Sequence, residues 1–409
     1  MIKNSSFLIL LFTILSYSVF AILYQNGYSW IIPESGPPGF YDLRVVLEST
    51  GCYNKGYDPY FTTNKDCPHV YNYPFVWIWL TNLLKLTIQD VYLIGFGMIF
   101  SFVLSISFLF RKITISNLIL LVITLISPPI LLLLDRANID IIIFILLLIA
   151  CYYLRTGFKS IAKIHFSYVL ILIATMFKIY PVFILGLIII DPIDIKHKYI
   201  VIVYSTVTLS LYTLFNLNEI LVLLGNTPHP SELAFGKNVL IQEFLSPSKL
   251  VYFSFLPFIV MILIVFYKRV FFKQLVSRLQ LDTSKEGKLF FGGVLLFTGT
   301  YFFGNNWDYR LVFVIFFFPY LFSDHLKNNE LNKFKNIFIL LLIIVLFTSF
   351  IHRSGYFFKS YHSWFIGRNL LMGLKYLIVT FFTAFGFYII FYYIMQQIDI
   401  LKLTFKKED

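Results

Sequence analysis

IIIFILLLIACYYL, residues 141–154, is a run of apolar and aromatic side chains that contains no charge. A second run, LILLFTILSYSVFAILY at residues 8–24, repeats the pattern near the N-terminus, and similar runs recur along the chain. A bilayer core about 30 Å thick requires about 20 apolar residues in a helix that crosses it. These runs predict membrane-spanning helices. The N-terminal run is long enough to indicate an uncleaved first span rather than a signal peptide.

The composition of the whole chain supports this interpretation. Its 409 residues are 58% hydrophobic and 13% charged, whereas a soluble domain has about 25% charged residues. Soluble, fibrous and disordered classes are therefore excluded. An outer-membrane barrel is excluded because its strands would alternate in polarity. The expected fold is an all-α polytopic membrane protein, with one integral membrane domain over residues 1–409.

The net charge of +12 does not indicate a nucleic-acid partner. The basic residues form short clusters between apolar runs, which is the pattern of cytoplasmic loops. Three cysteines are too few for a zinc site or a disulfide scaffold. We therefore expect no metal and no cofactor.

The expected topology has about ten full spans, a half-helix and a re-entrant hairpin. The spans are residues 6–24, 91–110, 114–134, 138–154, 199–216, 250–267, 288–304, 309–323, 336–352 and 371–395. Residues 73–88 are expected to return to the outer face, and residues 165–190, broken by a proline, to the inner face. This threading keeps most Lys and Arg inside. It predicts cytoplasmic termini, outer loops at 25–72 and 217–249, and a cell (inner) membrane protein with an extracytoplasmic active face.

The first outer loop contains a candidate acid. Residues 41–49 have helical periodicity, with Leu43, Val46 and Leu47 on one face, which predicts an amphipathic helix along the interface. Asp42 lies at its start, where a helix N-terminus favours the charged carboxylate. By itself this position indicates a helix cap as readily as a functional acid.

An ordered series of turns and tyrosines follows Asp42. It reads GYDPY at residues 56–60 and YNYP at residues 71–74. Aromatic residues at a membrane boundary are usually interfacial anchors, but anchoring does not explain their order. Cys52 and Cys67 lie in the same loop, and in an oxidising compartment they are expected to form a disulfide that fixes the 56–60 turn.

The series resembles the first outer loop of glycosyltransferase family 87 and, more distantly, the glycosylphosphatidylinositol mannosyltransferases. Both belong to the C-type membrane glycosyltransferase superfold. The matching residues are Asp42, Gly56, Pro59, Tyr60, Tyr73 and Pro74, with Phe75 where the family often has a second proline. Asn138 matches one position of a Gly-Gln-x-Asn element, and residues 178–181 resemble a Lys-x-x-Pro element. The resemblance covers about residues 1–200.

The resemblance implies a polyprenyl-phosphate sugar donor, such as a mannose or another hexose. It also implies a glycan or glycolipid acceptor, whose hydroxyl is presented at the outer face. The sequence contains neither a P-loop nor a G-x-G-x-x-G fingerprint, so a nucleotide donor has no evident cradle. Displacement with inversion needs one general base, which we assign to Asp42. A glycosidase would need two carboxylates.

Lys178 is the residue that most strongly indicates a functional site, independently of any family resemblance. A lysine at the centre of a membrane helix costs about 2.5–3.5 kcal/mol and usually faces a cavity or a partner. With Tyr180 it is expected to hold the donor phosphate. The alternative is a structural ion pair with Asp135 or Asp140.

Other polar residues near the outer face complete the expected site. Arg136, Arg44 and Arg310 are further candidates for the donor phosphate. The candidates for the substrate pocket are Asp135, Asn138, Asp58, Tyr60, Tyr73, Asn305 and Asp308. For residues 305–310 an aromatic belt with an Asp308–Arg310 pair is the structural alternative.

Two other functions are compatible with these patterns. A transporter or lipid-linked sugar flippase also has intramembrane charge, but transporters often show two matching halves with paired broken helices. Only one such break is visible here. An oligosaccharide polymerase or ligase tends to have its large outer loop late in the chain, whereas here the longest is the first. Membrane lipids are expected partners, and the oligomeric state is open.

Overall fold

The computed structural model describes residues 5–25, 39–65, 67–110, 113–155, 161–191, 193–226, 234–235, 256–282, 284–302, 306–326, 329–353 and 361–405. The chain forms two compact units. The first comprises Met1–Tyr153, Phe158–Val182 and Asp194–His229. The second comprises Leu154–Gly157, Phe183–Ile193 and Pro230–Asp409.

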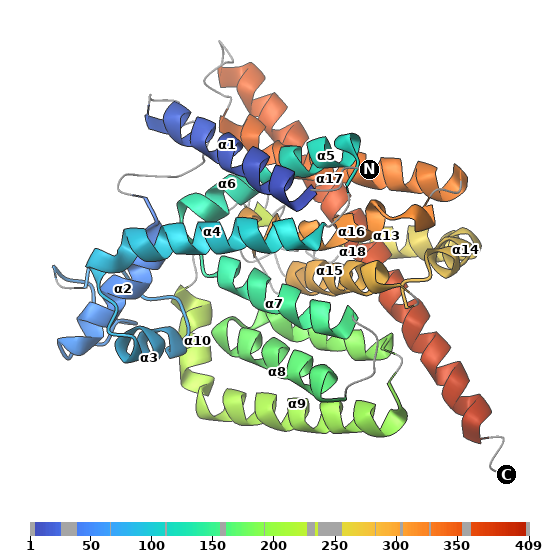
Figure 1. Ribbon diagram of the computed structural model, residues 1–409, viewed down its shortest axis with the longest axis horizontal. Helices are drawn as coiled ribbons and strands as arrows, with labels where there is room; N and C mark the ends of the chain where they lie inside the picture. The colour runs from blue at the N-terminus through green and yellow to red at the C-terminus, as the bar shows by residue number, and fades with distance from the viewer. Residues whose placement is uncertain are drawn as a thin grey trace. The chain divides into compact units, whose positions relative to one another are not determined.

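The regular elements of the first unit are helices. Its elements are α1 (Ser5–Gln25), α2 (Tyr41–Asn54), α3 (Val76–Leu83), η2 (Ile88–Asp90), α4 (Val91–Leu109), α5 (Ile115–Leu125), α6 (Pro128–Asp135), α7 (Asp140–Arg155), α8 (Ile161–Phe177), the start of η3 (Tyr180–Ile189), α9 (Ile195–Phe215) and α10 (Leu217–Asn226). Helix α2 packs on α3 and α4, and α8 packs on α3 and α9 (Figure 1). A helix satisfies its own backbone polar groups, as a lipid environment requires.

The second unit is also built from helices. Its elements are the rest of η3, β1 (Ala234–Phe235), α13 (Leu256–Tyr267), α14 (Arg269–Leu279), α15 (Lys285–Phe302), β2 (Asn306–Trp307), η5 (Asp308–Phe317), α16 (Phe318–Leu321), η6 (Asp324–Leu326), α17 (Asn329–Arg353) and α18 (Tyr361–Phe405). Strands β1 and β2 make a short antiparallel pair. Helix α15 is buried from Gly287 to Tyr301 and packs on η5 and α18, which makes it the centre of this unit.

Within the described residues, four helices are long and apolar enough to cross a membrane. They cover 88–109, 195–215, 330–348 and 370–399, and α5 with α6 makes a fifth if a bent pair counts as one span. The chain is therefore a multi-pass membrane protein. The expectation of about ten full spans is not confirmed, because α7, α8, α13 and the apolar part of α1 fall in the class of shorter apolar helices.

Two of the predicted spans are irregular helices. Residues 114–134 form α5 and α6, which meet at a bend of 55°. Pro128 and Pro129 open α6, and because proline has no N–H the hydrogen-bond ladder of α5 cannot continue through them. Residues 309–323 begin as the 3₁₀ helix η5 and only then become the α-helix α16.

The predicted half-helix at residues 73–88 and the predicted hairpin at residues 165–190 both contain short or interrupted helices. Helix α3 has 8 residues, a length of about 12 Å that is too short to cross the bilayer core. Helix α8 ends at Phe177, immediately before Lys178, and the chain resumes at Tyr180 as a 3₁₀ helix. The break at Lys178 is therefore confirmed, whereas the hairpin over residues 165–190 stays a prediction.

Candidate active site

Backbone bonds fix the start of α2 against the turn between α6 and α7. Gly39 and Phe40 adopt positive φ angles of 73° and 54°, so the chain reverses just before the helix. The N–H of Phe40 then donates to the Asp135 carbonyl at 2.7 Å, and the N–H of Asp42 donates to the Arg136 carbonyl at 3.1 Å. As a result the Asp42 side chain, 5% exposed, lies beside residues 136–138.

The ring of Phe40 anchors this arrangement on α4. It packs edge-on against Phe96, with ring centroids 5.3 Å apart. It also lies so close to Gly95 that a Cβ added there would be 2.5 Å from the ring. The absence of a side chain at Gly95 therefore permits Phe40, and with it the start of α2, to dock.

The variant Gly95→Ala tests this docking. We expect a loss of about 1–3 kcal/mol in stability, since overpacking a buried contact displaces side chains and backbone. Gly97→Ala is the matched control, because a Cβ at Gly97 on the same helix meets nothing within 4 Å. Thermal unfolding of both variants in detergent gives the comparison. Equal melting temperatures would show that Phe40 does not depend on Gly95.

The carboxylate of Asp42 accepts three hydrogen bonds. Arg136 donates from Nη2 to Oδ1 at 2.7 Å and from Nε to Oδ2 at 3.0 Å. The side-chain amide of Asn138, fully buried, donates to Oδ2 as well. A carboxylate has about four lone-pair positions, so about one of them is left for a further proton donor.

Lys178 lies on the other side of the same asparagine. Its ammonium donates to Asn138 Oδ1 at 3.2 Å and to Asp140 Oδ1 at 2.7 Å. Tyr180 donates its hydroxyl to Asp140 Oδ1 at 2.9 Å. Asn138 thus joins the Asp42–Arg136 pair to the Lys178–Asp140 pair, and we refer to these five residues together with Tyr180 as the buried polar network.

Aromatic faces enclose the two cations. The Lys178 ammonium lies 5.5 Å from the centroid of the Tyr73 ring, and the Arg136 guanidinium lies 4.9 Å from that of Tyr41. Cations are attracted to such faces. The Tyr73 hydroxyl is also 3.4 Å from the amide nitrogen of Asn138.

The network combines two acids and two cations in an apolar protein. Asp42, Asn138 and Asp140 are at most 5% exposed, and the side chains of Arg136 and Lys178 are each 12% exposed. Ions buried in this way are expensive to desolvate, and within membrane proteins they mark functional sites by default. The arrangement can accept a proton at Asp42 and can hold an anion at Arg136 and Lys178.

Other predicted site residues of the first unit lie around this network in different ways. The half-buried Asp135 contributes its carbonyl to Phe40. Tyr60 donates to the Tyr73 carbonyl at 3.1 Å, whereas Asp58 is exposed and accepts from the N–H of Tyr60. Arg44 binds elsewhere. It donates to the Gly39 carbonyl and to the Tyr92 hydroxyl, and its assignment to the donor phosphate stays a prediction.

The predicted residues of the second unit make a separate ion pair. Asp308 accepts from the Lys375 ammonium at 2.6 and 2.5 Å, and both side chains are at most 4% exposed. The cation of this pair comes from Lys375, far along the chain on α18, and the expected Asp308–Arg310 pair stays a prediction. Arg310 follows on η5, and Asn305 lies outside the described residues.

Cys52 and Cys67 form a disulfide, which confirms the expected pairing. It joins the last turn of α2 to the segment that leads to Tyr71. The enclosed loop contains the 56–60 turn, where Gly56 has a φ of 86°. A disulfide of this spacing restricts the unfolded chain.

Removal of this disulfide is expected to destabilise the loop. Cys52→Ser with Cys67→Ser should cost about 3 kcal/mol, the value for a loop of about 15 residues. Thermal unfolding with and without reductant measures it. Since Cys151 is the free cysteine of the chain, Cys151→Ser is the matched control. A wild-type melting temperature that does not respond to reductant would contradict the expectation.

Sequence reasoning did not place two of the contacts among the site residues. Asp140 binds both Lys178 and Tyr180, whereas the sequence suggests it only as a structural partner of the lysine. Lys375 is absent from the sequence-based prediction, although a lysine inside an apolar run is the same signal that identifies Lys178. Among the described residues, no group of three or more His, Cys, Asp or Glu could hold a metal ion.

No protein-family model matches the sequence, and no curated protein matches it. Among solved structures, the chain is similar to ArnT from Cupriavidus metallidurans in the apo state, with 13% identity and a TM-score of 0.38. The alignment covers 93% of this chain and 76% of that chain. At this level of similarity no residue role passes from one chain to the other. The roles below therefore rest on the contacts of the buried polar network.

Proposed function

We propose that this protein is a membrane glycosyltransferase of the C-type superfold. It moves a sugar, a hexose such as mannose, from a polyprenyl phosphate to a hydroxyl of a glycan or glycolipid, with inversion. The observation that carries the proposal is the buried polar network, in which two carboxylates and two cations from three segments of the chain meet around Asn138.

In this proposal Asp42 is the general base. The acceptor oxygen attacks the anomeric carbon, the bond from that carbon to the phosphate oxygen breaks, and the acceptor proton passes to the Asp42 carboxylate. Asp42 is suited to this task because Arg136 and Asn138 fix its orientation. General-base assistance of this kind contributes about 10²–10⁴ in rate.

The two cations stabilise the leaving group. The phosphate begins as a diester with one negative charge and leaves as a monoester with two, so positive charge is required more than a general acid. Arg136 and Lys178 supply it, and Tyr180 adds a hydroxyl donor. Because Arg136 also binds Asp42, a phosphate that attracts the guanidinium loosens its hold on the base. Donor binding thereby prepares the carboxylate to accept a proton.

The disulfide supports an outward-facing site. Disulfides persist in oxidising compartments, and Cys52 and Cys67 lie within the loop that carries Asp42 at its start. We therefore assign this loop and the reaction to the extracytoplasmic face of the membrane, with both termini in the cytoplasm.

The experiment must separate transfer from transport. Purified protein in proteoliposomes receives a polyprenyl-phosphate sugar labelled in the sugar, together with acceptor glycans and glycolipids. Transfer yields a labelled acceptor and free polyprenyl phosphate in equal amounts. A flippase moves the intact donor between leaflets without new product, and a polymerase or ligase lengthens or moves a preassembled glycan. Either of these results would replace the proposed function.

A further inference from the structure

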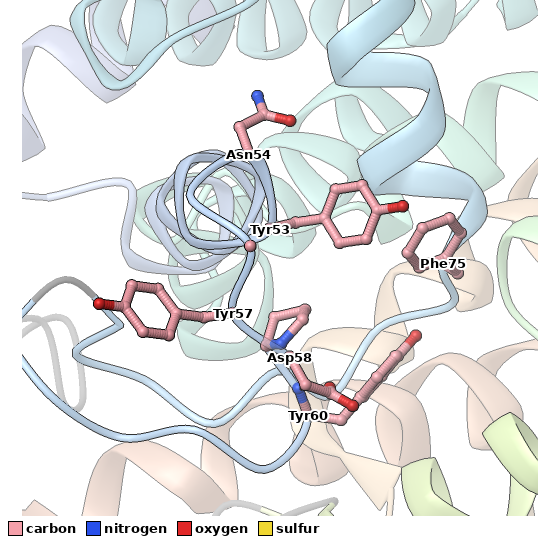
Figure 2. A pocket seen from close by; sticks show the side chains of 8 residues that line it. Tyr53, Asn54, Tyr57, Asp58, Tyr60 and Phe75 are labelled. Carbon is pink, nitrogen blue, oxygen red and sulfur yellow. The ribbon is translucent and has the colours of Figure 1, made fainter.

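The first outer loop forms an open hollow of about 660 Å³. Figure 2 shows the ring of Tyr53 beside that of Phe75, in edge-to-face contact with centroids 5.1 Å apart, with Tyr60 near Phe75 and Tyr57 on the opposite rim. Asn54 and Asp58 provide polar groups in its lining. Tyr60 connects the hollow to the buried polar network, because its hydroxyl donates to the carbonyl of Tyr73, whose own hydroxyl lies at Asn138.

Contacts beneath the hollow hold its walls in place. The Cys52–Cys67 disulfide ties the last turn of α2 to the segment that leads to Tyr71. Asn226 on α10 donates to the carbonyls of Tyr60 and Tyr71 at 2.9 and 3.3 Å. Glu219, also on α10, accepts from the N–H of Phe75 at 2.7 Å. The hollow is therefore preformed, as small-molecule sites usually are.

The hollow combines exposed aromatic faces with negative charge. Tyr53 and Tyr57 are 44% and 39% exposed, so a large part of each side chain is available to contact a ligand. None of the described residues that line the hollow is a cation. Burial raises the pKa of Tyr60, and the nearby Glu219 carboxylate raises it further, so this phenol stays protonated.

These features select against phosphate and for an uncharged polyol. A phosphate would meet the Asp58 carboxylate in the lining and lie near the Glu219 carboxylate beside Tyr60. None of the described lining residues is a cation that offsets this contact between like charges, which is unfavourable. A sugar ring offers C–H faces to the tyrosines. Its hydroxyls would find an acceptor in the Asp58 carboxylate and in the amide oxygen of Asn54, whose nitrogen already donates to Asn82 at 2.8 Å. An apolar site with a few orienting polar groups has this pattern.

We infer that this hollow binds an uncharged sugar unit of the acceptor, while the donor phosphate binds at the buried polar network. That the bound sugar belongs to the acceptor rests on the proposed function, whereas the binding of an uncharged sugar at this hollow does not. Two sources present the same chemistry, a soluble oligosaccharide and the headgroup of a glycolipid.

Direct binding to the full chain in nanodiscs tests the inference. Saturation-transfer NMR and calorimetry use four probes: a neutral mannose oligosaccharide, its sulfated counterpart, a neutral glycolipid in the nanodisc and free polyprenyl phosphate. We expect binding of the neutral sugar in one or both forms. Binding of the glycolipid alone identifies the membrane as the source, and binding of the soluble sugar shows that the headgroup suffices.

Variants assign the binding to the hollow. Tyr53→Ala and Tyr57→Ala are expected to weaken binding of the neutral sugar on the order of tenfold, and Tyr57→Phe to restore it, because the ring remains. Phe61→Ala is the matched control, since Phe61 lies in the same loop and is 70% exposed but does not line the hollow. Binding of polyprenyl phosphate should be unchanged in all of them.

Three results would overturn the inference: no binding of either neutral probe, equal binding of the sulfated probe, or the same affinity in the tyrosine variants as in Phe61→Ala. Neutral sugar binding at the hollow without any sugar transfer would instead contradict the proposed function and leave the sugar site in place.

Discussion

Lys178→Met is expected to lower the stability of the protein by about 3–5 kcal/mol, because it leaves a buried carboxylate without its cation. That carboxylate belongs to Asp140, which is fully buried and accepts from the Lys178 ammonium at 2.7 Å. Thermal or denaturant unfolding in detergent measures the loss. The single variant alone does not separate a structural ion pair from a phosphate-binding role.

A second variant makes that separation. Lys178→Met combined with Asp140→Asn removes both charges, so the free energy of unfolding is expected to recover most of the loss. The affinity for polyprenyl phosphate should stay lower than in wild type by roughly 10–100-fold, which corresponds to the free energy of one hydrogen bond to a charged group. If the double variant regains both stability and phosphate affinity, Lys178 is a structural residue only.

Asp42→Asn is expected to reduce the rate of sugar transfer by about 10²–10⁴. Asparagine keeps the shape of the side chain and an oxygen that can accept from Arg136, but it cannot take up the acceptor proton. The loss should therefore appear in kcat. Affinity for polyprenyl phosphate should be maintained or increased, since Arg136 is no longer neutralised by a carboxylate.

The control for this variant is Asp324→Asn, which removes an exposed carboxylate on η6. It is expected to transfer sugar at the wild-type rate. Asp42→Glu provides a further test, because a carboxylate in a displaced position should recover part of the activity. Transfer by Asp42→Asn within a few-fold of wild type would remove Asp42 from the reaction and leave it as a residue that orders α2.

Local patterns in the sequence predicted much of the helical content. The periodicity of residues 41–49 predicted a helix, and the structure has one from Tyr41 to Asn54 in which Leu43, Val46 and Leu47 are buried. Lys178 was identifiable because a lysine inside an apolar run is unusual. These inferences need only neighbouring residues and the properties of the bilayer.

The partners of the charged residues could not be derived in the same way. Asp308 pairs with Lys375, which lies far along the chain, and Arg44 donates to Tyr92 although it is two residues from Asp42. Such pairings depend on how segments far apart in the sequence pack, and no local pattern encodes this.

The bend before Pro128 was missed for a different reason. The two prolines are visible in the sequence, but the long apolar run around them favours a continuous span.

The most direct test of the central claim is the configuration of the new glycosidic bond. Purified protein in proteoliposomes is given a polyprenyl-phosphate sugar of known anomeric configuration, and NMR identifies the linkage in the product. A single displacement with Asp42 as the base predicts transfer with inversion. Retention would require a carboxylate nucleophile and a second displacement and would contradict the account, as would donor that crosses the membrane without forming a new bond.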